Sequence, residues 1–253
     1  MIELDLLRHA QVAGEPALYG ATNINTKKLE GERLLTSLVF KQKSTNAYDA
    51  IISSPLLRCQ NLAKQLADEC QLPLTIIDNL QEMNFGIFDG VPFDDIPYGE
   101  SLAGKAKGNT SAADSRLHWS MLERFFEKPA EINLPNGETL SGFHLRVSNA
   151  WQNIIEQQLS LVLQKKPSEM TSRPRRVLVI AHGGVIRMII ANILKSNWQL
   201  GSWHQNLKIS NASLSQINVS LPQLDNNGDA QYPVEKINQQ VNFIGLPLLK
   251  ENT

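Results

Sequence analysis

Residues 176–187, RVLVIAHGGVIR, form the stretch that decides the fold class. Arg176 to Ala181 predicts a buried strand, because an apolar run of this length, rich in β-branched residues, has no polar face to turn toward water. Val185 to Leu194 predicts a buried helix soon afterwards. Between them stands His182, where the chain leaves the strand. A strand that passes directly into a helix is the unit from which parallel sheets are built.

Further segments of both kinds surround this unit. Residues 2–7 form an apolar run without a helical period, which predicts a strand that stops at Arg8-His9. Ser54 and Pro55 are expected to open a helix, as its cap and in its first turn. The other expected strands are Tyr48–Ile52 and Leu74–Ile77, and the other expected helices are Lys28–Phe40 and a long amphipathic one marked by Leu140 to Ile155. Alternating strands and helices predict an α/β fold, a three-layer sandwich with a mostly parallel central sheet flanked by helices.

The length predicts a single domain over residues 1–253, with an insertion at about 92–135. Gly99 to Ser115 is rich in Gly, Ala, Lys and Ser, and both its flanks resemble core sequence. We therefore expect a surface loop there, with some lid-like motion. Trp119, Phe125 and Phe126 have helical spacing, which favours packing onto the core over gripping a base ring.

Composition excludes several classes of protein. The net charge is −1 and apolar residues make up 42% of the chain, so no whole-chain field attracts nucleic acid or an anionic membrane. No run approaches the roughly 20 apolar residues that span a bilayer, and the N-terminus lacks a secretion signal. Cys59 and Cys70 lack metal-binding spacing. We expect a cytoplasmic protein with no nucleic-acid or membrane partner, no metal and no cofactor.

Two predicted strands end in the same way, each with a histidine. One ends in Leu7-Arg8-His9 and the other in Ala181-His182, although the chain has only five histidines. Either motif alone would be explained as the polar start of a loop. Because the carboxyl ends of parallel strands meet at one edge of a sheet, the pair predicts a shared site.

Two charged residues are candidates for the same site. Arg58 lies early in the helix after Ser54, where its planar fork could bind a phosphate at the helix's amino end. The alternative is a solvated helix arginine. Glu82 lies in an irregular, apolar-rich loop and is either a general acid or an ordinary surface carboxylate. Glu138 is expected to favour the first turn of the long helix.

Four motifs occur in order along residues 6–190: Leu7-Arg8-His9, Ser54-Pro55-Leu56-Leu57-Arg58-Cys59, Glu82-x-x-Phe85-Gly86-x-x-Asp89-Gly90, and Ala181 to Arg187. In this order they resemble the histidine phosphatase (phosphoglycerate mutase-like) superfamily. The resemblance implies that His9 is the nucleophile that takes the phosphoryl group. It also implies that Arg8, Arg58 and His182 bind the phosphate, with His182 part of the catalytic set, and that Glu82 protonates the leaving alkoxide.

Physical reasoning supports these assignments. Phosphoryl transfer depends mainly on positioning and on stabilising charge at the equatorial oxygens. Two guanidinium groups and an imidazolium can supply that charge, so we expect a metal-independent reaction. His9 must be neutral to attack, and neighbouring cations should lower its pKa below about 6.5. Ala10 stands where the superfamily usually has glycine, and it would shift the loop if that position needs a positive φ.

Finer features resemble the α-ribazole phosphatase-like branch, which removes the 5′-phosphate from α-ribazole phosphate during assembly of the lower loop of cobalamin. These features are Tyr19-Gly20-Ala21-Thr22, the compact Glu82 loop, and His182 to Arg187 with Asn211-Ala212-Ser213. Tyr19-Gly20 is alternatively a plain turn, and Asn211-Ala212-Ser213 the entry to a strand. The alternatives are a broad phosphatase for sugar phosphates or nucleotides, a phosphoglycerate mutase, and a non-catalytic interaction protein. The expected partner is a small phosphorylated metabolite, and a homodimer is the oligomer we consider.

Overall fold

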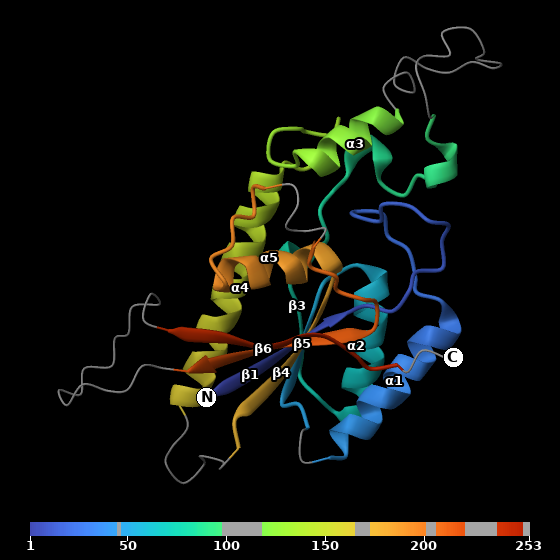
Figure 1. Cartoon of the computed structure of the whole chain (residues 1–253). Helices are drawn as coiled ribbons and strands as arrows, with labels where there is room; N and C mark the ends of the chain where they lie inside the picture. Colours follow the sequence, from blue (N-terminus) through green and yellow to red (C-terminus); the bar gives the residue numbers. More distant parts are fainter. Residues whose placement is uncertain (45–46, 98–117, 165–172, 201–205, 221–236, 250–253) are drawn as a thin grey trace, which may run out of the picture.

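The computed structural model describes residues 1–44, 47–97, 118–164, 173–200, 206–220 and 237–249. Within these ranges a six-stranded sheet forms the centre, in the order β3-β2-β4-β1-β5-β6 (Figure 1). The strands are β1 (Ile2–Arg8), β2 (Ala50–Ser53), β3 (Leu74–Ile76), β4 (Arg175–Ala181), β5 (Ser213–Ser220) and β6 (Asn238–Pro247). The first four are parallel, whereas β5 is antiparallel to both β1 and β6. The sheet is therefore mixed, and the ends of β1 and β4 meet at one edge.

Helices cover both faces of the sheet. They are α1 (Lys28–Gln42) and α2 (Leu57–Cys70) on one face, and α4 (Leu140–Leu163) and α5 (Gly183–Ile193) on the other (Figure 1). Leu6 and Val179 pack in the α4–α5 cluster, whereas their neighbours Leu7 and Ile180 pack in the α1–α2 cluster. Alternating side chains on these central strands thus meet apolar layers on both sides. The predicted α/β sandwich is confirmed.

The predicted insertion region contains one regular helix within the described residues, α3 (Trp119–Glu127). Phe125 is buried in the α4–α5 cluster, and Trp119 and Phe126 pack against it. The prediction that these rings pack onto the core is confirmed. The Gly99 to Ser115 loop lies outside the described residues. The single domain with an insertion at about 92–135 stays a prediction.

The predicted start of α2 is wrong. The helix begins at Leu57 instead of near Ser54, and the Leu57 N–H donates to the side chain of Asn23 at 2.8 Å. Ser54 is fully buried, and its hydroxyl lies 2.7 Å from Nε2 of His182. A serine that caps a helix would need its oxygen free for that helix's own N–H groups, so the contact with His182 explains the error.

Strands β5 and β6 were not predicted as strands, and three short 3₁₀ segments occupy the irregular region after β3. These segments are η1 (Asp78–Leu80), η2 (Gly86–Phe88) and η3 (Phe93–Asp95). None of the helices in the described ranges combines the length and the apolar character needed to cross a membrane.

Candidate active site

His9 lies at the end of β1 and lines a cavity of about 750 Å³. Its Nδ1 lies 2.7 Å from the carbonyl oxygen of Ala10, so Nδ1 carries the proton and donates it. Nε2 has no hydrogen-bond partner among the described residues and keeps its lone pair. Burial, followed by the charge of Arg58, lowers the pKa of His9 to about 3. A neutral ring with the proton on Nδ1 is consistent with the expectation for His9, whose role in the reaction stays a prediction.

His182 lies at the end of β4, and its ring centroid is 5.2 Å from that of His9. Arg58 Nε donates to His182 Nδ1 at 3.1 Å, so the opposite nitrogen carries the proton and donates to Ser54. Complete burial, with Arg58 and His9 nearby, lowers the pKa of His182 well below its usual range. The hydrogen bonds of His182 are those of a neutral ring, and a buried ring beside two arginines resists a third positive charge. The imidazolium expected during phosphoryl transfer stays a prediction.

Arg58 and Asp89 hold the segment 19–22 from two sides. Arg58 donates to the carbonyl oxygens of Tyr19, Gly20 and Thr22 at 2.7–2.9 Å. Asp89 accepts three N–H groups of the same segment at 2.7–3.2 Å. Gly20 is required, because a Cβ there would lie 1.9 Å from a backbone oxygen. Much of the hydrogen-bonding capacity of Arg58 is thus used to build the wall of the site.

Arg8 has a buried donor without a partner among the described residues of the site. One of its terminal nitrogens donates to the carbonyl oxygen of Ile209. Its Nε is buried and has no hydrogen-bond partner in the described part of the chain. A buried charged donor without a partner is costly, and a phosphate oxygen would satisfy it. Arg8 lines the His9 cavity, so it is well placed to bind an anion there.

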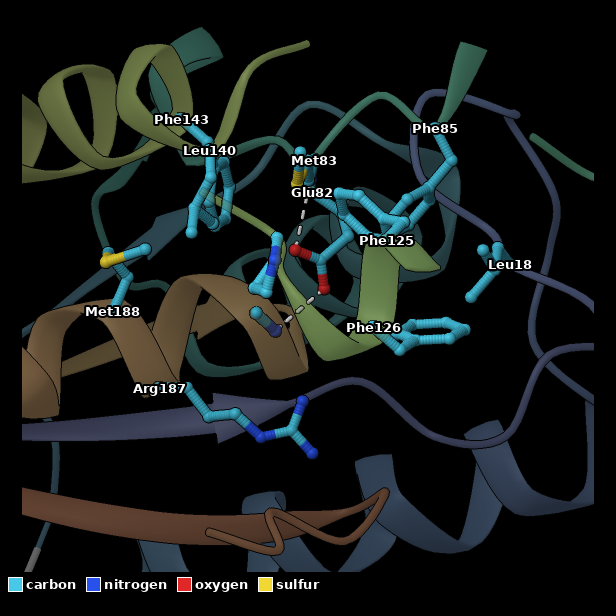
Figure 2. Close-up of a pocket in the computed structure, with 12 residues that line it drawn as sticks. Leu18, Glu82, Met83, Phe85, Phe125, Phe126, Leu140, Phe143, Arg187 and Met188 are labelled. Atoms are coloured by element: carbon cyan, nitrogen blue, oxygen red, sulfur yellow. Dashed lines mark hydrogen bonds between the residues drawn. The ribbon is translucent and has the colours of Figure 1, made fainter. Parts of the chain in front are cut away.

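Glu82 reaches the site from the loop between η1 and η2. Its Oε2 accepts the N–H of Gly184 at 2.8 Å, and its Oε1 accepts the N–H of Met83 at 3.1 Å (Figure 2). Gly184 belongs to the first turn of α5, where free N–H groups favour a carboxylate. A Cβ on Gly184 would lie 2.3 Å from Glu82 Oε1. The glycine is therefore what allows the carboxylate to approach the helix.

A second cavity, of about 180 Å³, adjoins the first beside Glu82 (Figure 2). Its lining is mainly apolar and includes Leu18, Met83, Phe85, Phe125, Phe126, Leu140, Phe143 and Met188. The two cavities share Leu18, Glu82, Phe85, Gly184 and Arg187. Glu82 thus lies at the boundary between a polar cavity that contains His9 and an apolar pocket. An acid at this boundary could protonate an oxygen that joins a phosphate on one side to an alcohol on the other.

A family model, the histidine phosphatase superfamily (branch 1), matches residues 4–100 and 98–223 of this chain. The chain belongs to the histidine phosphatase superfamily. This membership confirms the resemblance seen in the motifs, and the chain is a phosphatase of the histidine phosphatase type.

Relatives of this histidine phosphatase carry different substrate names. A protein named "Putative phosphoserine phosphatase 2" from Hydrogenobacter thermophilus is 24% identical over 237 residues, 87% of this chain and 90% of that protein. A mycobacterial glucosyl-3-phosphoglycerate phosphatase has a TM-score of 0.67 at 19% identity, covering 97% of this chain and 99% of that one. The α-ribazole phosphatase from Shigella flexneri has a TM-score of 0.64 at 17% identity, covering 98% and 100%. At these identities the solved structures share the fold, while the substrate is a separate question.

Ala10 fits this histidine phosphatase without backbone strain. It is 1% exposed, packs in the α1–α2 cluster and is not among the residues with positive φ. From the other side, Asn211 Nδ2 and the N–H of Ala212 both donate to the carbonyl oxygen of His9. The segment around Asn211 is therefore the entry to β5 and also a support for His9.

Arg187 is a residue of the histidine phosphatase site to which the sequence assigned no role. It lines both cavities, and its Nε donates to the carbonyl oxygen of Leu207 at 2.7 Å. Burial lowers the pKa of Arg187, and the Glu82 carboxylate opposes that effect. The spacing contained a signal, because Gly183, Gly184 and Arg187 share one helical face at i+3 and i+4. In the described ranges, no three His, Cys, Asp or Glu side chains form a group that could hold a metal ion.

Proposed function

We propose that this phosphatase hydrolyses a phosphomonoester through a phosphohistidine on His9, and that its substrate is α-ribazole 5′-phosphate. The observation that carries the proposal is the position of Glu82, which lies between the His9 cavity and the apolar pocket. A substrate whose phosphate faces His9 and whose alcohol enters the pocket would present its bridging oxygen to this carboxyl group.

In the first step, His9 Nε2 attacks phosphorus and the bond from phosphorus to the bridging oxygen breaks. Glu82, protonated at this stage, transfers its proton to the departing oxygen, so the alcohol leaves neutral. In the second step, Glu82 takes a proton from water, whose oxygen attacks phosphorus as the N–P bond breaks. Inorganic phosphate leaves and His9 regains its lone pair. The hydrogen bond from Nδ1 to Ala10 holds the ring in one orientation throughout.

We assign to Arg8, Arg58 and His182 the role of stabilising negative charge on the transferring phosphoryl group. Arg8 has a buried unpaired N–H, and Arg58 orients His182 through its Nε. An arriving phosphate dianion would raise the pKa of His182 and favour its protonation there. Fixed cations of this kind stabilise the equatorial oxygens, which is the role that magnesium has in other phosphoryl-transfer enzymes. We therefore propose that the reaction needs no metal ion.

The alcohol is proposed from the lining of the pocket. Phe85, Phe125 and Phe126 gather beside Glu82 (Figure 2), and Arg187 is the cation among the described residues that line the pocket. α-Ribazole carries an aromatic benzimidazole base, which suits such rings by stacking and by burial of apolar area. A glucosyl or seryl group would place polar atoms against the same apolar surface at a cost. We propose that the partner is a small phosphorylated metabolite and that the protein acts in the cytoplasm. A homodimer is the oligomer to be tested.

The test compares kcat/KM for α-ribazole 5′-phosphate, 3-phosphoglycerate, L-phosphoserine, a nucleoside monophosphate and glucose 6-phosphate, each with and without EDTA. We expect α-ribazole phosphate to lead and EDTA to have no effect. A flat profile would reject the cobalamin substrate and favour a broad phosphatase, and a magnesium requirement would reject the proposed mechanism. Separately, the His9→Ala protein should form no acid-labile phosphoenzyme, and persistent labelling would place the nucleophile elsewhere. No turnover of any of these substrates would reject the proposed substrate.

A further inference from the structure

The Glu82 loop is held from behind by an arginine on α4. Arg146 Nη1 donates to the carbonyl oxygens of Asn79 and Gln81, both at 2.9 Å, and Nη2 lies 3.3 Å from the carbonyl oxygen of Glu82 itself. Among the described residues, no strand or isolated bridge pairs with residues 79–82. One guanidinium thus provides the hydrogen bonds that a neighbouring strand would provide elsewhere.

Glu138 fixes that arginine. Its carboxylate accepts Arg146 Nε at 2.9 Å and Nη2 at 2.7 Å, a two-bond pairing that sets both the position and the plane of the guanidinium. Both side chains are 21% exposed, so water screens the pair only in part. The expectation that Glu138 favours the first turn of α4 is wrong, because Thr139 caps that helix and Glu138 precedes the cap. Its contact with Arg146 is the observed role.

We infer that the Arg146–Glu138 pair is a positioning device for the proton donor of the reaction. A third cavity, of about 360 Å³, is lined by both Glu82 and Arg146. Arg146 lines neither the His9 cavity nor the apolar pocket, so it lies outside the two cavities assigned to the substrate. It acts through Glu82, whose main chain it holds while Gly184 holds the carboxylate. The inference rests on the proposed role of Glu82 as the acid and adds a residue pair that sets its position.

Two substrates with different leaving groups can distinguish a residue pair that positions the acid from a pair that only stabilises the fold. Benzyl phosphate releases an alkoxide, which needs a proton as the bond breaks. p-Nitrophenyl phosphate releases a stabilised phenolate, which needs almost none. Both carry an aromatic ring of similar size for the pocket. A displaced acid therefore lowers kcat/KM for benzyl phosphate and leaves kcat/KM for p-nitrophenyl phosphate nearly unchanged, whereas partial unfolding lowers both equally.

The experiment measures kcat/KM for both substrates with wild type, Arg146→Gln, Glu138→Gln and Glu82→Gln. This parameter covers the steps up to departure of the alcohol and excludes the return step of Glu82. We expect Arg146→Gln to lower the value for benzyl phosphate by roughly 10- to 100-fold and the value for p-nitrophenyl phosphate by less than about threefold. Glu138→Gln should show a smaller loss in the same direction. Arg146→Lys should recover part of the activity, because one ammonium cannot make all the bonds of a guanidinium.

The matched control is Arg175→Gln. Arg175 also makes a side-chain hydrogen bond, to Gln158 of α4 at 2.8 Å, but it lies at the opposite end of β4 from His182. Equal losses on both substrates, or no loss, in Arg146→Gln would overturn the inference while leaving the acid role of Glu82 intact. If Glu82→Gln itself lowers kcat/KM equally for both substrates, the proposed acid role fails and the inference fails with it.

Discussion

Substitution of Gly184 by alanine should impair catalysis while leaving the fold intact. Gly184 lies in the first turn of α5, and its N–H donates to the Glu82 carboxylate at 2.8 Å. An alanine methyl would lie 2.3 Å from Oε1 and 3.0 Å from the carboxyl carbon. The clash is with the end of a flexible side chain, so the side chain is what will move.

The overlap sets the size of the effect. An ordinary carbon–oxygen contact is about 3.3 Å, so the carboxylate must retreat by roughly 1 Å and give up its bond to the helix. A displacement of about 1 Å in a catalytic group can cost on the order of 100-fold in rate. The helix itself tolerates alanine well, since Gly184 is not among the residues with positive φ. We therefore expect the free energy of unfolding to change by less than about 1 kcal/mol.

The assay pairs kcat/KM for benzyl phosphate and p-nitrophenyl phosphate with urea unfolding. The expected result is a loss of roughly 10- to 100-fold on benzyl phosphate only. Gly31→Ala is the control, because Gly31 also lies within a helix and its added methyl would have Thr26 Oγ1, at 3.1 Å, as its near contact. Wild-type activity of Gly184→Ala on benzyl phosphate would refute the placement of Glu82 as the acid. A large loss of stability would refute the view that only the carboxylate moves.

Three further outcomes are expected. In a urea titration, Asp89→Asn should lower the free energy of unfolding by about 2–4 kcal/mol, because the Asp89 carboxylate accepts four backbone N–H groups. Asp94 is exposed, so Asp94→Asn should change the free energy of unfolding little and serves as the control. Burial holds the pKa of His9 at about 3, so its contribution to stability is complete above about pH 6.5 and is lost as the pH falls toward 3. Removing the imidazole in His9→Gln should reduce the slope of unfolding free energy against pH between 4 and 6 by up to about 1.4 kcal/mol per pH unit, and an unchanged slope would contradict the depressed pKa. Burial raises the pKa of the Cys59 thiol well above its usual range, so an aromatic disulfide reagent should react faster with Cys70 in the native protein and with both thiols in urea.

Much of the fold was predictable because the central strands and main helices carry strong local patterns. The run from Val177 to Ala181 is fully buried, and an apolar run of that kind has few other solutions. Strand β6 was missed for the opposite reason. Its sequence, Asn238 to Pro247, is rich in Asn and Gln, and its alternating exposure comes from an edge position that only the pairing with β5 creates.

The candidate site likewise contains residues that the sequence predicts and residues that it does not. Arg8 is the last residue of β1, and His9 and His182 directly follow β1 and β4, so the sheet places them and the sequence predicts their proximity. The supports of Glu82 were not predictable, since Arg146 lies 64 residues further along the chain and shows only as one arginine of a helix. The start of α2 was predicted wrongly for the same reason, because the side chain that accepts the Leu57 N–H belongs to Asn23, 34 positions away. Hydrogen bonds between distant loops leave no periodic trace in a sequence.

This division has a consequence for catalysis. His9, the proposed nucleophile, directly follows a strand whose apolar side chains are buried, whereas Glu82, the proposed acid, lies on a loop held by hydrogen bonds from Arg146 and Gly184. A loop of this kind opens more easily than the core, so small losses of loop order reach Glu82 before they reach His9. Substitutions around the loop should therefore lower proton transfer to the alcohol while phosphorylation of His9 by activated aryl phosphates continues. The ratio of kcat/KM between substrates whose leaving groups do and do not need a proton should therefore detect damage to the loop better than overall activity does.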